Sequence, residues 1–236
     1  MQKAALITGA SNRIGKDIAL ALAGAGYNIA LHYNHSEQKA AQTRLEILAK
    51  NVFCETFKAD LKNRNQTIEL LSNISQKFNI SLLVNNASMF IPDHLSDGND
   101  PLFDELFNIN FKAPYLLTRE FAKRTKKGLI INLLDTNISK NSSSHFNYLL
   151  TKKFLEVFTK MSAVELAPGI RVNGIAPGLI LPPKGKDNSY LERLSDKIPL
   201  KSIGDVKNIS DTVLFFIKNE FITGQIIYVD GGENLL

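Results

Sequence analysis

Short apolar runs alternate along the chain with longer stretches in which apolar residues recur every three or four positions. The short runs predict seven β-strands, over residues 4–8, 28–33, 52–58, 81–85, 128–134, 171–175 and 225–229. The longer stretches predict six helices, over residues 14–24, 37–50, 65–77, 101–123, 146–166 and 206–218. Such alternation is typical of a parallel sheet covered by helices on both faces. We therefore predict an α/β fold in which residues 1–236 form a single domain on a Rossmann-type, doubly wound, parallel seven-stranded sheet.

Two polar segments, residues 92–100 and 181–195, interrupt this rhythm. Both are expected at the carboxyl edge of the sheet, where ligands bind in such folds. The second segment is rich in proline and lysine, and we interpret it as a mobile flap over a substrate. Either segment could instead be a plain surface connection.

Composition excludes several classes of protein. The chain is 44% hydrophobic and 22% charged, as in ordinary globular proteins, and no stretch approaches the roughly 20 apolar residues of a membrane span. The N-terminus runs directly into a predicted strand without a signal-peptide pattern. The single cysteine, Cys54, fits a reducing compartment and is interpreted as a packed, inert residue. We expect a cytoplasmic protein that binds no membrane.

The net charge of +5 does not indicate a nucleic-acid surface. The densest basic run, residues 123–127, falls at a predicted helix end, where cations complement the helix dipole. A nucleic-acid site would need a broader patch with interleaved aromatic residues. The mild positive charge still suits an anionic substrate or a phosphorylated cofactor.

A glycine turn after the first predicted strand indicates a dinucleotide site. Gly9 permits a tight turn directly after the strand, and Gly15 lets the next helix pack close to the sheet. The amides at the start of that helix can hold a pyrophosphate.

The residues near this turn favour NADPH over NADH. An NAD site usually has a carboxylate at the end of the second strand, and residues 31–36 contain none. Arg13, Asn34, His35 and Ser36 instead offer a cation and several donors, which suit a 2′-phosphate. Arg13 could alternatively form only a surface salt bridge.

Tyr148 and Lys152 stand four positions apart in a predicted helix, which places a phenol and an ammonium on one face. A free tyrosine titrates near ~10, and a nearby cation lowers that pKa. We therefore expect Lys152 to lower the pKa of Tyr148 toward a value useful for proton transfer.

The order and spacing of these motifs resemble the short-chain dehydrogenase/reductase family over essentially the whole chain. One matching piece is the Thr8–Gly15 turn, in which Arg13 replaces the family's middle glycine. A second is Asn-Asn-Ala-Ser at 85–88, in which Ser88 replaces the last glycine of the family's Asn-Asn-Ala-Gly motif. The resemblance implies that Lys152 also binds the nicotinamide ribose and that Asn110 holds a water in a proton relay. It implies a homotetramer and further cofactor contacts from Ile14, Asp60, Leu61, Asn86, Ala87, Ser88, Tyr148, Pro177 and Gly178.

Asp135 departs from the family pattern, because it stands where the family usually has serine. A carboxylate would repel the oxyanion formed from a ketone, but it can pass a proton through Tyr148 to a ring nitrogen. Asp at this position, Arg13 and the Asn-Ala-Ser-Met-Phe segment resemble pteridine reductases and bacterial dihydromonapterin reductases. That resemblance implies that Phe90 stacks on a flat pterin and that Ser88 binds the pterin or the cofactor phosphate. Ile180, where eukaryotic-type enzymes tend to have serine, favours a dihydropterin.

These features predict an NADPH-dependent reductase of dihydropterins, with dihydrofolate as a further candidate substrate and no metal site. The expected catalytic residues are Asp135, Tyr148, Lys152 and Asn110, and the expected substrate contacts are Ser88, Phe90, Asp135 and Tyr148. A 3-oxoacyl-carrier-protein reductase or another carbonyl reductase is the enzymatic alternative, against which Asp135 argues. A cofactor-binding regulator with vestigial chemistry is a third reading, against which the retained Asn110, Tyr148 and Lys152 argue.

Overall fold

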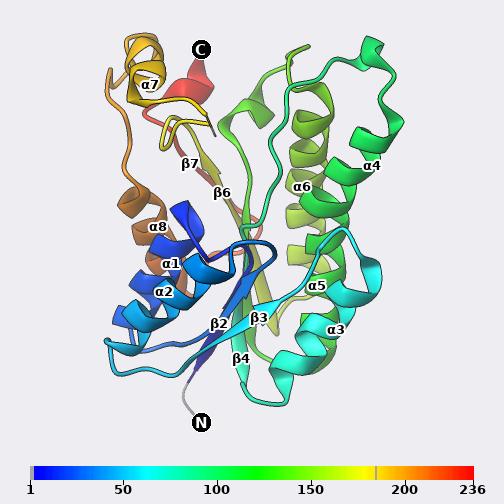
Figure 1. The fold of residues 1–236 in the computed structure, drawn as a ribbon, viewed down its shortest axis with the longest axis vertical. Helices are drawn as coiled ribbons and strands as arrows, with labels where there is room; N and C mark the ends of the chain where they lie inside the picture. The colour runs from blue at the N-terminus through cyan, green and yellow to red at the C-terminus, as the bar shows by residue number, and fades with distance from the viewer. Residues whose placement is uncertain (1–2, 184) are drawn as a thin grey trace.

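The computed structural model describes residues 3–183 and 185–236 and contains a seven-stranded, wholly parallel sheet. Its order is β3-β2-β1-β4-β5-β6-β7, as in a doubly wound fold (Figure 1). The strands are β1 (Ala4–Ile7), β2 (Asn28–Tyr33), β3 (Cys54–Lys58), β4 (Ile80–Asn85), β5 (Gly128–Leu133), β6 (Ile170–Pro177) and β7 (Ile226–Val229). The predicted sheet is confirmed, with strand ends displaced by up to two residues.

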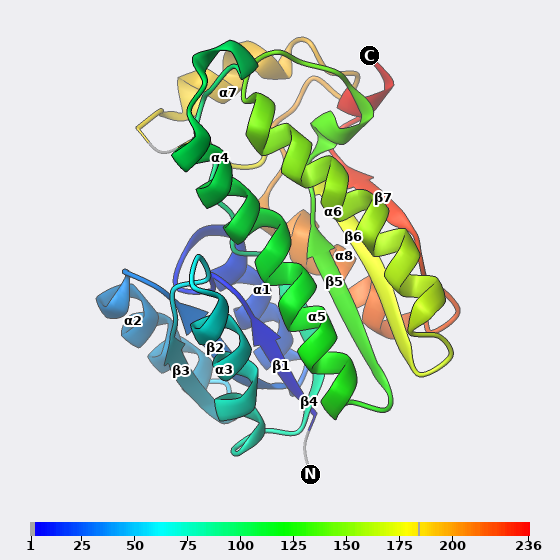
Figure 2. The ribbon, with the colours of Figure 1, turned by 90° about the vertical axis from the view of Figure 1, so that its right-hand side faces the viewer.

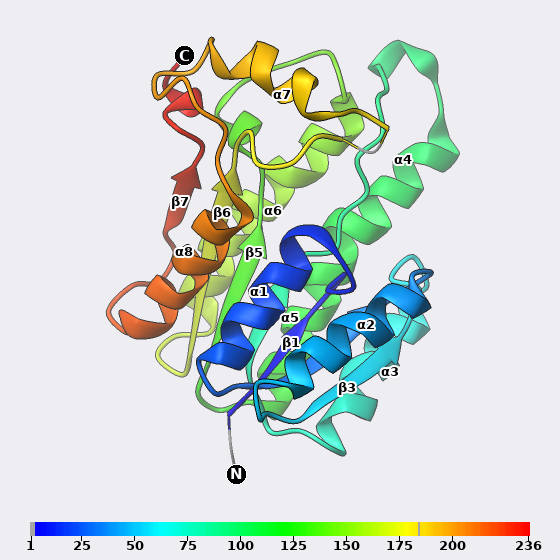
Figure 3. The same cartoon turned by 60° about the vertical axis from the view of Figure 1, so that its left-hand side comes forward.

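Helices cover both faces of this sheet. One face carries α1 (Arg13–Gly24), α2 (Glu37–Leu48) and α8 (Val206–Lys218), which come forward in Figure 3. The other face carries α3 (Arg64–Ser75), α4 (Asp100–Phe107), α5 (Ala113–Arg124) and α6 (Phe146–Glu165), as Figure 2 shows. No helix of the described residues is long and apolar enough to cross a membrane.

The two hydrophobic cores follow from the alternation of side chains along each strand. Ala5 and Ile7 of β1 pack with the core beneath α1 and α8, whereas Ala4 and Leu6 pack with the core beneath α3 and α5. All four are at most 1% exposed. Since both faces are buried, the strand is apolar throughout, as parallel strands usually are.

The helix predicted over residues 101–123 is interrupted by a π-helical turn, η2 (Asn108–Lys112), which separates α4 from α5. Pro114, at the start of α5, has no N–H to give to the Asn110 carbonyl four residues earlier. A π turn of this kind is rare and often marks a functional site. The sequence analysis missed the interruption, although Pro114 signals it.

Short helices also occur in both polar segments. The first contains the 3₁₀ turn η1 (Leu95–Asp97), and the second contains α7 (Asn188–Ser195), which the sequence analysis treated as loop. Leu191 is buried on the inner side of α7, so this segment is partly packed. Two further 3₁₀ turns, η3 (Thr136–Ser139) and η4 (Glu233–Leu235), lie in contact with each other.

We expect Gly15→Ala to destabilise the protein, whereas Gly24→Ala in the same helix should not. A Cβ on Gly15 would lie 2.5 Å from both the Asn86 amide nitrogen and the Gly9 carbonyl oxygen, but one on Gly24 would meet nothing within 4 Å. Overpacking typically costs about 1–3 kcal/mol, while a tolerated Gly→Ala adds roughly 0.4–1 kcal/mol of stability. Urea unfolding of both variants measures the difference, and equal stabilities would contradict the tight approach at Gly15.

Candidate active site

The turn after β1 and the turn after β4 meet where the strand order reverses, which is the usual ligand crevice of such sheets. The Thr8 hydroxyl accepts hydrogen bonds from the backbone N–H groups of Asn86 and Ala87, both at 2.9 Å. In return the Asn86 side chain donates to the carbonyls of Thr8 at 2.8 Å and Gly9 at 3.2 Å. Asn86 and Ala87 therefore hold the glycine turn in place through hydrogen bonds to Thr8 and Gly9. Thr8 supports the turn in this way, a role that the sequence analysis did not assign.

His32 on β2 holds the same turn from the other side. The Gly9 N–H donates to His32 Nδ1 at 3.1 Å, and Nε2 lies 3.1 Å from the Ala59 carbonyl oxygen. This pairing requires a neutral ring with its proton on Nε2, because Nδ1 acts as an acceptor. Burial lowers the pKa of His32 to about 4, which agrees with a neutral ring.

The predicted 2′-phosphate residues lie at the start of α1 and directly after β2. Arg13 has a φ of 54°, and its guanidinium donates to the Pro182 carbonyl at 2.7 Å. His35 is exposed, and Ser36 precedes α2. Arg13 therefore contacts the segment after β6 and forms no salt bridge among the described residues.

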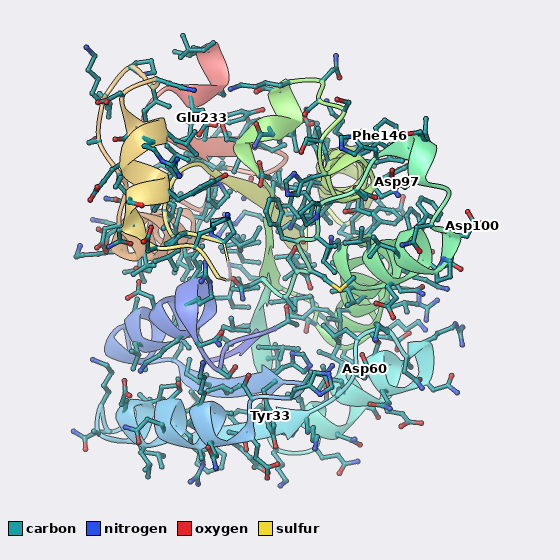
Figure 4. The ribbon with its side chains drawn as sticks, turned by 45° about the horizontal axis from the view of Figure 1, so that its top comes forward. Tyr33, Asp60, Asp97, Asp100, Phe146 and Glu233 are labelled. Atoms are coloured by element: carbon teal, nitrogen blue, oxygen red, sulfur yellow. The ribbon has the colours of Figure 1, made fainter. Side chains whose placement is uncertain are left out.

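Asp60 and Leu61 follow β3, beside the end of β2. Asn34 donates to an Asp60 carboxylate oxygen at 3.3 Å, which also accepts from the Lys62 N–H at 3.0 Å. Leu61 is buried. Figure 4 shows Asp60 and Tyr33 on this side of the molecule, on the far side from Glu233.

Asp135 and Tyr148 form a direct pair at the carboxyl end of β5. The Tyr148 hydroxyl donates to Asp135 Oδ2 at 2.8 Å, while Asp135 Oδ1 accepts from the backbone and side-chain nitrogens of Asn137, each at 2.8 Å. Asn137 thereby fixes the carboxylate so that one oxygen faces Tyr148. The predicted meeting of these two residues, 13 positions apart in sequence, is seen directly.

The direction of the Tyr148 pKa shift differs from the expectation. Burial, and then the charge and hydrogen bond of Asp135, raise the pKa of Tyr148 well above its ordinary value. The Lys152 ammonium lies 5.7 Å from the centre of the Tyr148 ring and donates to the Leu133 carbonyl at 2.8 Å. Burial and the neighbouring Asp135 thus keep the pKa of Tyr148 high, and the phenol keeps its proton at neutral pH.

Lys152 is itself perturbed, since it is only 2% exposed. Burial lowers its pKa to about 8, partly offset by the negative charge of Asp135. An amine is charged below its pKa, so Lys152 is mainly an ammonium at neutral pH and loses that charge as the pH rises through about 8. A cationic donor beside the Tyr148 ring is therefore available in the neutral range.

The Asn110 side chain is fully occupied by protein groups. Its oxygen accepts from the Met89 N–H at 2.8 Å and the Ser88 hydroxyl at 3.1 Å, and its nitrogen donates to the Met89 carbonyl at 3.0 Å and to Thr151 Oγ1 at 3.2 Å. The side-chain oxygen and nitrogen thus have protein partners, and the role of Asn110 in holding a relay water stays a prediction. Its backbone carbonyl, which receives no N–H from Pro114, is the better candidate acceptor.

A buried polar chain fixes α6 against the sheet. Asn85 on β4 donates to Asn132 on β5 at 2.8 Å, Asn132 donates to Thr159 at 2.8 Å, and Thr159 donates to the Leu155 carbonyl at 2.7 Å. Buried polar groups paired in this way favour one orientation of the helix. Sequence reasoning missed Asn132 and Thr159, although two polar side chains among apolar positions were a usable signal.

Phe90 lies beside the Asp135–Tyr148 pair. Its ring is 45% exposed and meets the Tyr148 ring edge-on, at 4.7 Å between centroids and 88° between planes. Ser88, two positions earlier, is exposed. The structure thus brings Phe90, Asp135 and Tyr148 together, while Ser88 is turned toward Asn110.

Pro177 ends β6, and Gly178 follows it beneath the C-terminal turn. A Cβ on Gly178 would lie 2.6 Å from the Asp230 Cβ and 3.0 Å from Glu233 Oε2, so only glycine fits there. Asp230 accepts from the Thr136 hydroxyl at 2.5 Å and thereby joins the C-terminal turn to η3, next to Asp135. Ile14, in the first turn of α1, packs against the core beneath that helix.

Comparison with known proteins identifies the family. A family described as enoyl-(acyl carrier protein) reductase matches residues 9–234. The chain belongs to the short-chain dehydrogenase/reductase family. It is therefore an oxidoreductase. Among the residues that the structure describes, no group of three or more His, Cys, Asp or Glu side chains could hold a metal ion.

Relatives of the chain within the short-chain dehydrogenase/reductase family include an acyl-carrier-protein reductase and a pteridine reductase. The 3-oxoacyl-[acyl-carrier-protein] reductase FabG of Staphylococcus epidermidis is 34% identical over 241 residues, covering 98% of this chain and 99% of that protein. Pteridine reductase 1 of Leishmania tarentolae is 32% identical over 277 residues, covering 98% and 96%. The crystal structure of FolM alternative dihydrofolate reductase 1 from Brucella canis, complexed with NADP, has a TM-score of 0.95 at 34% identity and covers 100% and 94%.

Proposed function

We propose that this protein is an NADPH-dependent reductase of pterins, acting on 7,8-dihydropterins such as dihydromonapterin, with dihydrofolate as a further candidate. The observation that carries the proposal is the 2.8 Å bond from the Tyr148 hydroxyl to Asp135, with the exposed Phe90 ring beside it. The likeness to the FolM and pteridine reductase relatives supports it.

The residues present fit a nicotinamide dinucleotide. Only glycine is accommodated at positions 15 and 178, and the first turn of α1 offers backbone N–H groups to a pyrophosphate. Lys152 would hold the nicotinamide ribose, and Arg13, Asn34, His35 and Ser36 would surround the 2′-phosphate. Bound NADPH supplies the hydride.

The chain's own residues handle the proton. Because its pKa is raised, Tyr148 remains a phenol and can donate to a substrate ring nitrogen. When Asp135 takes up a proton from solvent, the hydrogen bond reverses, and its O–H donates to the phenolic oxygen. The phenolic proton can then pass to the substrate while Asp135 restores it.

A carboxylate in this position suits a C=N bond better than a ketone. Reduction of a C=N bond leaves a nitrogen that takes up a proton, whereas reduction of a ketone builds negative charge on oxygen beside Asp135. The negative charges of Asp135 and of such an oxygen would repel each other strongly in a partly buried site.

The second candidate is a 3-oxoacyl-carrier-protein reductase, which the relatives from Staphylococcus favour at 34% identity. The deciding experiment measures the rates with dihydrobiopterin, dihydromonapterin, dihydrofolate and an acetoacetyl thioester at saturating NADPH. We expect the dihydropterins to be reduced far faster than the thioester. Thioester turnover without pterin turnover would overturn the proposal in favour of this second candidate.

Arg13→Ala is expected to weaken NADPH binding by roughly 10- to 150-fold and to leave NADH binding unchanged. A charge-assisted hydrogen bond contributes about 1.5–3 kcal/mol, and only NADPH carries the 2′-phosphate. Fluorescence titration of both cofactors measures this. Arg13→Gly is the matched variant, because glycine accepts the φ of 54° without strain and still removes the cation. Equal wild-type affinities for NADPH and NADH would contradict the cofactor assignment.

We further propose that the protein is a homotetramer and that it is located in the cytoplasm. Large apolar side chains are exposed along α5 and α6, among them Tyr115, Phe154, Met161 and Val164 at 43%, 45%, 67% and 81%. Patches of this kind on a soluble protein usually mark an interface. Light scattering after size-exclusion chromatography would measure the assembly.

A further inference from the structure

His145 stacks on the Phe90 ring. The ring centroids are 4.2 Å apart and the planes differ by 13°, so the two rings are nearly parallel and in contact. Neither the family motifs nor the sequence analysis assigned a role to His145. The contact places a second aromatic ring against the side chain that we expect to bind a flat substrate.

The backbone at His145 is unusual. This residue precedes α6 with φ 55° and ψ 43°, a left-handed conformation that is uncommon outside glycine and that asparagine, aspartate and histidine adopt more often than other residues. The ring also lies 2.8 Å from the Ser144 hydroxyl through Nδ1. The backbone conformation and the contact with Ser144 accompany the stacking of the imidazole on Phe90.

The loop that carries Phe90 is fastened to the same turn of α6. Asp93, which is 5% exposed, accepts from the Asn147 N–H at 3.2 Å and from its side-chain nitrogen at 2.6 Å. The Phe146 N–H donates to the Asp93 carbonyl at 3.3 Å. Phe146 is labelled in Figure 4, at the end of α6 that lies nearest this loop. The loop therefore cannot shift relative to α6 without breaking these bonds.

The spacing of the rings shows which face of Phe90 can receive a substrate. A third ring between Phe90 and His145 would need about twice the usual stacking distance, so the 4.2 Å separation leaves no room for it. His145 lies one helical turn before Tyr148, toward the N-terminus of α6. A flat substrate that stacks on Phe90 must therefore use the face that His145 does not cover.

We propose that His145 is a positioning residue that backs the Phe90 ring, so that Phe90 presents a fixed surface to a flat heteroaromatic substrate. The inference rests on the proposed function and names the side chain that orients its stacking ring. Burial lowers the pKa of His145, against the opposing effects of Asp93 and Asp135 and with a small further lowering by His94. The imidazole therefore stacks as an uncharged ring at neutral pH.

His145→Asn is the test variant, because asparagine tolerates the left-handed backbone but has no aromatic ring. We expect the KM for dihydropterin to rise about 3- to 10-fold, the range for loss of one aromatic pair. The kcat and the Kd for NADPH should change less than twofold, because the bond from Tyr148 to Asp135 is untouched. In a Phe90→Ala background the same substitution should not change KM further, because the ring that His145 backs is absent.

The outcomes separate this inference from the proposed function. An unchanged or lowered KM in His145→Asn, with normal pterin turnover, would overturn the role of His145 and leave the reductase assignment intact. A KM that His145→Asn raises equally in the Phe90→Ala background would also overturn it, since the effect would then not pass through Phe90. Absence of pterin turnover in the wild-type enzyme would contradict the proposed function itself, and the inference with it.

Discussion

Tyr148→Phe is expected to bind NADPH normally and to lose about 10²- to 10⁴-fold in turnover, the usual contribution of a positioned general acid. The substitution removes one hydroxyl, which is the only group of Tyr148 that can pass a proton to a substrate nitrogen. The ring remains in place against Phe90, so substrate stacking should survive.

Stopped-flow measurement of hydride transfer, together with the Kd for NADPH, checks this expectation. Tyr27→Phe is a matched control, because it removes the hydroxyl of a tyrosine just before β2, at the opposite edge of the parallel sheet from Asp135 and Tyr148. Normal turnover in Tyr148→Phe would show that another group delivers the proton and that the catalytic assignment is wrong.

Asp135→Ser should depress dihydropterin turnover by about 10²-fold or more, because it interrupts the supply of protons to Tyr148. It should also lower the pKa of Tyr148, since Asp135 raises that pKa through its charge and its hydrogen bond. Any loss of activity caused by ionisation of Tyr148 would then begin at a lower pH. Weak ketone reduction is expected to rise, because serine can donate to an oxyanion where a carboxylate repels it.

The pH profile of kcat for the variant and the wild type, with pterin and thioester substrates, provides the measurement. Asp135→Asn is the companion variant, since it keeps the size of the side chain but removes the charge. Full pterin activity in Asp135→Ser would mean that Asp135 serves only to cap η3, for which its bond to the Asn137 N–H would be sufficient.

Periodicity was sufficient to predict the sheet, because buried parallel strands are continuous apolar runs and their helices recur at regular intervals. The family and the fold are confirmed. The π turn was missed because apolar spacing barely changes across one widened turn. Helix α7 was missed because it has only 8 residues and because the prolines and lysines at 182–186, just before it, obscure its two buried positions, Leu191 and Ser195.

The site was predicted less completely, and the reason is physical. Spacing along one helix places Tyr148 and Lys152, but it does not state what lies beside them in space. The Tyr148 pKa shift was predicted in the wrong direction because the degree of burial and the 2.8 Å contact with Asp135 depend on tertiary structure. The stack of His145 on Phe90 joins two loops 55 positions apart, and no local pattern signals it. The roles of the remaining cofactor residues stay predictions.

His32 makes the dinucleotide end of the molecule sensitive to acid. Its pKa is about 4 in the folded protein and near 6.5 when the chain is unfolded, so the unfolded chain binds more protons between these values. Stability therefore falls as the pH drops from about 6.5 to about 4, by on the order of 3 kcal/mol in total. A protonated ring could no longer accept the hydrogen bond from Gly9. Acidification toward pH 4 would therefore loosen the glycine turn, because it protonates the side chain that holds this turn in place.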